Sequence, residues 1–123
     1  LLLSKMVEEA LHKAGYVNVR KFNNGQEAWE YLSQIRDDSD LDEKVSLIIT
    51  DIEMPEMDGH HLTKLIKSDK KLKRLPVIIF SSLINEQMEI KGREVGADEQ
   101  LSKPEIGHLV SVIDGLLERR RNG

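Results

Sequence analysis

The chain of 123 residues carries a formal net charge of −4, contains no cysteine, and is 33% charged and 39% hydrophobic. This length suits a single domain, residues 1–123, around one core. The composition excludes disulfide frameworks and thiolate sites, the net charge gives no general attraction to nucleic acid or to anionic membranes, and no apolar run could span a bilayer, so we expect a cytoplasmic protein.

The first part of the chain alternates between helical and strand patterns. Residues 3–14 place their apolar side chains on one helical face, and Gly15 follows where a helix would end. Residues 17–22 alternate apolar and polar side chains, which predicts a strand near a sheet edge. A second helix is predicted over residues 26–35, and the acidic residues 37–44 are typical of a solvated connector.

The central stretch of the chain is an apolar run that ends at an acid. Residues 45–50 carry no charge and are rich in β-branched types, which predicts a strand buried on both faces, as in a parallel sheet. Asp51 follows directly, and residues 54–59 contain proline and glycine turn signals. Because ligands of open α/β sheets bind at the carboxyl ends of the strands, the carboxylate of Asp51 is predicted to lie at a crevice.

The second part of the chain repeats the alternation of helix and strand. Two more strands are predicted over residues 77–80 and 99–102, and they lead into Ser81 and Lys103. Three helices are predicted: residues 62–74, ended by Pro76; a helix capped by Asn85 with few apolar side chains, expected to be the loosest; and a helix from Ile106 to Leu117 or beyond. The adjacent histidines His60 and His61 are interpreted as surface residues, and the basic residues 67–74 as a solvated helix end.

Strands that alternate with helices predict an α/β fold with a doubly wound parallel sheet. Three chemically complementary side chains follow strands of this sheet: the carboxylate of Asp51, the hydroxyl of Ser81 and the amine of Lys103. Because the carboxyl ends of parallel strands share one edge, we expect these three groups to lie together.

The run from Val45 to Gly59 resembles the phosphoacceptor segment of bacterial response-regulator receiver domains. The shared features are a hydrophobic strand, then Asp51, a Met-Pro pair and an Asp-Gly pair, with Lys103-Pro104 further on. The resemblance implies the flavodoxin-like (CheY-like) receiver fold with strand order 2-1-3-4-5. It also implies that the first strand, which ends in an acidic pair, is missing from this chain, so we expect the sequence to start inside the domain.

The resemblance also implies the roles of the site residues. Asp51 would accept a phosphoryl group from a histidine kinase, and Mg²⁺ would be held by Asp51, the backbone carbonyl of Glu53 and the missing acidic pair, without which metal binding should be weak. Ser81 would donate its hydroxyl to the phosphoryl group, and Lys103 would form an ion pair with it, next to a Lys103–Pro104 peptide that is usually cis in the family. Such a domain is no enzyme beyond promoting its own phosphorylation and dephosphorylation.

Within the family, residues 22–29 and 101–106 look most like the receiver of CheV-type chemotaxis proteins, in which a domain resembling CheW precedes the receiver. This implies a chemotaxis kinase, chemoreceptors and coupling proteins as partners. One departure from the family is Gln100, at a position where many receivers carry Tyr or Phe that couples phosphorylation to the outer face.

Two alternatives stay open. The departure at Gln100 and the missing acidic pair are compatible with a pseudo-receiver, a protein-interaction module that phosphorylation does not regulate. An enzyme of the haloacid-dehalogenase type would also use an aspartate at a strand end, but it would carry a second aspartate where this chain has Glu53.

Overall fold

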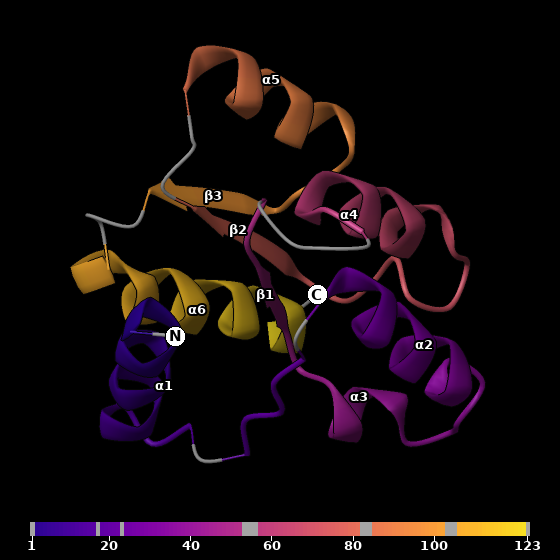
Figure 1. Ribbon diagram of the computed structural model, residues 1–123. Helices are drawn as coiled ribbons and strands as arrows, with labels where there is room; N and C mark the ends of the chain where they lie inside the picture. The colour runs from indigo at the N-terminus through magenta and orange to yellow at the C-terminus, as the bar shows by residue number, and fades with distance from the viewer. Residues whose placement is uncertain are drawn as a thin grey trace.

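The computed structural model describes residues 2–16, 18–22, 24–52, 57–81, 85–102 and 106–122. Within these residues a parallel sheet has the order β1-β2-β3, with strands β1 (Ile48–Thr50), β2 (Val77–Ser81) and β3 (Glu99–Ser102). The helices are α1 (Leu2–Lys13), α2 (Gly25–Ile35), α3 (Leu41–Lys44), α4 (Gly59–Ser68), α5 (Glu86–Glu94) and α6 (Ile106–Asn122). Figure 1 shows them on both faces of the sheet, which confirms the predicted α/β architecture with a parallel sheet.

Two apolar clusters lie on opposite faces of the sheet, because successive residues of β2 point to opposite sides. Val77 packs with side chains from α2, α3 and α4, among them Leu32, Leu41 and Ile66. Ile78 packs instead with Leu11 of α1 and with residues of α6. All five residues of β2 are buried, so this strand forms the centre of the described sheet.

The prediction of a strand over residues 17–22 is wrong for residues 18–22, which form no strand. Val17 lies outside the described residues. A strand needs a neighbour to pair with its backbone N–H and C=O groups. Within the described residues the sheet consists of β1, β2 and β3, and none of these strands pairs with residues 18–22. The alternating pattern alone therefore does not form a strand.

The prediction that residues 37–44 form a solvated loop is wrong for part of this connector. It contains helix α3, in which Leu41 is completely buried in the cluster beneath α2 and α4. The surrounding charges pair with one another at the surface, as Lys44 Nζ lies 2.5 Å from Asp38 Oδ2 and 3.6 Å from Asp40 Oδ1. The acidic composition of this segment thus gave no sign that Leu41 packs into the core.

The third predicted helix ends earlier than expected. Helix α4 stops at Ser68, because Asp69 adopts an extended conformation and its carboxylate accepts hydrogen bonds from the backbone N–H groups of Lys71 and Leu72. The turn that follows buries Leu72 and Leu75 completely. The basic residues 70–74 are therefore part of a turn with an apolar underside.

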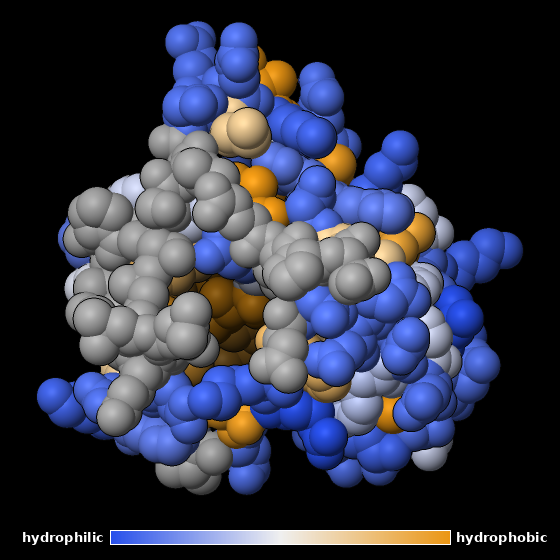
Figure 2. Space-filling model, in the orientation of Figure 1, coloured by the Kyte–Doolittle hydropathy of each residue, from blue (hydrophilic) through white to orange (hydrophobic). Residues whose placement is uncertain are grey.

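Strand β1 is shorter and less buried than the predicted strand over residues 45–50. Val45 ends α3, and both Ile48 and Ile49 are only half-buried. Within the described part of the chain, β1 pairs with β2 alone. Figure 2 shows hydrophobic surface in a hollow at the place where β1 and α6 lie in Figure 1.

Candidate functional site

Asp51 lies immediately after β1, at the carboxyl edge of the sheet, and is half-buried. The residue before it, Thr50, is buried and donates a hydrogen bond from its hydroxyl to the Asp51 carbonyl oxygen over 3.0 Å. The apolar strand thus carries the Asp51 carboxylate to the sheet edge.

Ser81 is brought to the same edge. It is the last residue of β2, has no exposed surface, and is the register partner of Ser102, the last residue of β3. Thr50 is the register partner of Ile79, so Asp51 is level with the residue just before Ser81. The remaining predicted site residues, Lys103 and Glu53, lie outside the described residues, as does the Lys103–Pro104 peptide.

The first turn of α4 packs directly against the backbone of Asp51. A Cβ atom at Gly59 would lie 2.0 Å from the Asp51 carbonyl oxygen, so only glycine permits this approach. The Gly59 N–H donates to the carbonyl oxygen of Ile52, and the buried hydroxyl of Thr63 donates to the Gly59 carbonyl over 2.7 Å. Sequence reasoning identified Asp58-Gly59 as a turn but missed this packing, because the signal for a turn glycine does not reveal what the glycine contacts.

The turn also begins α4 in a defined way. Asp58 is the N-cap, and its carboxylate accepts a hydrogen bond from the backbone N–H of His61 over 2.8 Å. Such a cap stabilises a helix by about 1 kcal/mol. The backbone after Asp51 is therefore held by a capped helix and not by a loop alone.

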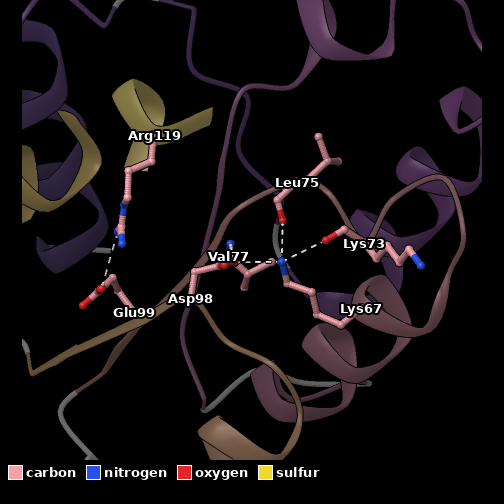
Figure 3. A network of polar contacts seen from close by, with 7 residues as sticks. All are labelled: Lys67, Lys73, Leu75, Val77, Asp98, Glu99 and Arg119. Atoms are coloured by element: carbon pink, nitrogen blue, oxygen red, sulfur yellow. Dashed lines mark hydrogen bonds and ion pairs between the residues drawn. The ribbon is translucent and has the colours of Figure 1, made fainter. Parts of the chain in front are cut away.

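The opposite edge of the sheet is fixed by Lys67, which is not the solvated side chain that its basic neighbourhood suggested (Figure 3). Its Nζ atom lies 2.8 Å from Asp98 Oδ2 and donates to the carbonyl oxygens of Leu75 and Lys73 over 2.8 and 3.1 Å. Asp98 Oδ2 also accepts from the Val77 backbone N–H, at the start of β2. These contacts join α4 to the starts of β2 and β3, and so help to align the strand ends that carry Ser81 and Ser102.

The prediction that both histidines are surface residues is wrong for His60. This residue is 2% exposed, whereas His61 is exposed. Burial lowers the pKa of His60, and the charge of Lys91 lowers it further, against the opposing effects of Asp58 and of a hydrogen bond with the Met88 backbone. The hydrogen bond with the Met88 backbone places α5 against His60, which the sequence of α4 could not indicate.

The described residues do not by themselves make a metal centre. They contain no group of three His, Asp or Glu side chains placed to hold a metal ion. Mg²⁺ usually binds to proteins through one or two carboxylates together with water and phosphate oxygens, and Asp51 is one carboxylate at this edge. Among the helices of the described ranges, none is both long and apolar enough to cross a membrane.

Comparison with protein families and curated proteins gives consistent matches. The family model of the response regulator receiver domain matches residues 2–114. The chemotaxis protein CheY1 of Helicobacter pylori (strain ATCC 700392 / 26695) is 32% identical over 102 residues, which cover 83% of this chain and 77% of that protein. A gliding motility regulatory protein of Myxococcus xanthus is 34% identical over 117 residues, which cover 95% of this chain but only 14% of the relative.

Solved structures give the same match. The signal receiver domain of a signal transduction histidine kinase from Syntrophus aciditrophicus is 32% identical, with a TM-score of 0.78 over 94% of this chain and 81% of that one. The receiver domain of the sensor histidine kinase PA1611 from Pseudomonas aeruginosa PAO1, crystallised with a magnesium ion coordinated in its active site cleft, has the same fold at 19% identity, with a TM-score of 0.78 over 95% of this chain and 89% of that one.

Proposed function

This chain belongs to the response regulator receiver domain family, a class of signalling modules rather than classical enzymes, and we propose that its Asp51 accepts a phosphoryl group from a histidine kinase. The observation that carries the proposal is that Asp51 directly follows β1 at the sheet edge where Ser81 ends β2. A carboxylate and a hydroxyl at one edge suit phosphoryl transfer, which depends on positioning and on charge stabilisation.

In the proposed reaction, a carboxylate oxygen of Asp51 attacks the phosphorus atom of a phosphohistidine. A P–O bond forms, the P–N bond breaks, and the leaving imidazole keeps the electron pair and takes a proton from solvent. Ser81 donates its hydroxyl to a phosphoryl oxygen, and Lys103 supplies an ammonium group beside it. The close packing of Gly59 supports this role, because it fixes the backbone from which the Asp51 carboxylate projects.

We include Mg²⁺ in the proposal only together with further carboxylates that would complete its site. We propose that Asp51 and the backbone carbonyl of Glu53 hold the ion with an acidic pair from a first strand ahead of Leu1. When bound, Mg²⁺ neutralises charge on the incoming phosphoryl group. The magnesium site of the PA1611 receiver supports this choice of metal.

The test is phosphorylation of a chain that has been extended at Leu1 by a strand ending in two aspartates. With acetyl phosphate and Mg²⁺, we expect a mass increase that hydroxylamine removes, because an acyl phosphate is labile to it. Asp51→Asn should abolish the increase. Asp58→Asn is the matched control, since Asp58 caps α4 in the same loop, and it should retain the increase. Phosphorylation that survives Asp51→Asn would contradict the proposal.

A second candidate function is a pseudo-receiver that binds partners without phosphorylation. Gln100 favours it, because this position holds an amide where many receivers have the aromatic ring that transmits the signal. If the extended chain binds its partner equally well as wild type and as Asp51→Asn, with and without acetyl phosphate, the pseudo-receiver is the better description.

We further propose that the domain serves in the cytoplasm as the receiver of a CheV-type chemotaxis protein, with a chemotaxis kinase, chemoreceptors and coupling proteins as its partners. The similarity to CheY1 of Helicobacter pylori supports a chemotaxis role. Transfer of phosphate to Asp51 from a phosphorylated chemotaxis kinase, but not from unrelated histidine kinases, is the expected result. Equal transfer from all kinases would contradict this assignment.

A further inference from the structure

Helix α5 has little apolar contact with the rest of the domain. Gly92 is the only buried residue of this helix, and Ile90 is 42% exposed. Figure 1 places α5 over β3 and beside α4, and Figure 2 shows that its outer surface is largely hydrophilic. Because apolar burial is slight, polar contacts must contribute much of what holds this helix in place.

The contact between α5 and β3 is made by Gln100. Its Nε2 atom donates a hydrogen bond to the carbonyl oxygen of Glu89 over 2.9 Å. A Cβ atom at position 92 would lie 2.2 Å from Gln100 Oε1, so the amide rests directly against Gly92. Gln100 thus occupies the space that the absence of a side chain at Gly92 leaves beneath the helix.

The contact between α5 and α4 is made by His60, in the first turn of α4. His60 makes a hydrogen bond with the Met88 backbone, and the charge of Lys91, one helical turn further along α5, also acts on it. These residues neighbour Glu89 and Gly92, which contact Gln100. His60 and Gln100 therefore hold adjacent stripes of the same helix.

Both contacts leave a polar atom buried without a partner. Throughout the described ranges, His60 Nε2 and Gln100 Oε1 are the buried side-chain nitrogen and oxygen atoms that make no hydrogen bond. A buried polar group without a partner costs about 1–3 kcal/mol, so each of these side chains weakens the docking that it provides. Release of α5 would expose both atoms to water.

We propose that His60 and Gln100 form a polar clasp that holds α5 against α4 and β3, and that protonation of His60 opens the clasp. In the docked state an imidazolium would be buried, with no acceptor for its Nε2–H, and the positive charge of Lys91 on α5 would disfavour it. Asp58, the N-cap of its own helix, is the opposing negative charge. In the released state water would solvate the imidazolium.

The direction of the pH effect follows from linkage. The pKa of docked His60 is lowered from its ordinary value of 6.5, because burial and Lys91 both disfavour the charged form. The docked state therefore binds fewer protons than the released state. The clasp is intact above about pH 6.5 and weakens as the pH falls below that value.

The experiment compares amide hydrogen exchange in α5 and α6 of this chain between about pH 8 and about pH 5, the range in which histidine titrates. After correction for intrinsic exchange rates, we expect protection in residues 86–94 to fall severalfold at the acidic end, while protection in α6 stays constant. The His60 imidazole resonances and the α5 amide resonances should titrate together. Parallel loss of protection in α6, or α5 resonances that do not follow His60, would overturn the proposal.

Variants separate the clasp from general acid instability. His60→Leu should remove the pH dependence in α5, whereas the exposed neighbour gives the matched control, His61→Leu, which should retain it. Gln100→Ala should lower α5 protection at both ends of the pH range, because it removes the hydrogen bond to Glu89 without removing the titrating group. A His60→Leu chain with wild-type pH dependence would overturn the proposal.

Discussion

At the residue scale, the atoms that surround a glycine decide whether a larger side chain can replace it. At Gly59 the helix backbone lies so close to Asp51 that a methyl group would overlap the carbonyl oxygen, whereas at Gly115, within α6, nothing lies within 4 Å of an added Cβ atom. Both glycines are helical and are identical in chemistry. The difference comes entirely from what the fold places beside them.

We predict that Gly59→Ala destabilises the domain by about 1–3 kcal/mol, because either Asp51 or the start of α4 must move. Gly115→Ala is the matched control and should stabilise it by about 0.5–1 kcal/mol, since alanine is the better helix former. Urea unfolding measures both values. Equal effects of the two substitutions would show that the contact with Asp51 is unimportant.

The sequence alone was sufficient to place Asp51 and Ser81 at the ends of strands. It was not sufficient to predict that another helix covers His60. Asp51 and Ser81 stand where apolar runs stop, and a strand end is a local signal. The burial of His60 depends instead on α5, more than twenty positions later in the chain. The roles of Asp51, Ser81, Lys103 and Glu53 stay predictions, and Lys103 and Glu53 also lie outside the described ranges.

At the scale of elements, periodic patterns predicted α1, α2 and α6 well, because each of these helices buries one regular face. A continuous apolar run predicted β2, which is buried on both faces. The failures have physical causes. A lone apolar anchor such as Leu41 has no period to detect, and the side chain of Asp69 ends α4 by bonding to the backbone of the next turn. Neither signal is visible in composition.

The contacts of Lys67 lead to a prediction about α4 and β3. Lys67 is largely buried and bonds to Asp98 and to two carbonyl oxygens, whereas Arg119 and Glu99 lie 3.8 Å apart and their side chains are 69% and 39% exposed. In a double-mutant cycle, Lys67→Met and Asp98→Ala should therefore show a coupling free energy of about 1–2 kcal/mol.

The same cycle on Arg119→Met and Glu99→Ala is the control, and it should give less than about 0.5 kcal/mol, as is usual for solvated pairs. Thermal or urea unfolding of the four single and two double variants provides the numbers. A coupling for the pair Lys67 and Asp98 that is no larger than the control would mean that this network does not align the strands.

At the scale of the whole molecule, the described sheet is open on one side. Strand β1 has half-buried isoleucines, residues 18–22 form no strand, and hydrophobic surface shows in the hollow beside β1 and α6. A single additional strand between β1 and residues 18–22 would pair with both and cover this surface. The same strand, in the order expected for receivers, would bring an acidic pair to the edge that carries Asp51.

We therefore predict that joining a β-branched strand that ends in two aspartates ahead of Leu1 changes three properties together. The amides of residues 18–22 should become protected from exchange, the free energy of unfolding should rise, and Mg²⁺ should bind with a calorimetric signal that the shorter chain lacks. The control strand ends in two asparagines, and it should restore protection and stability without Mg²⁺ binding, because neutral amides do not supply the charge that the ion requires. If residues 18–22 remain unprotected in both extended chains, the sheet is not completed from this side, and the acidic pair must come from elsewhere.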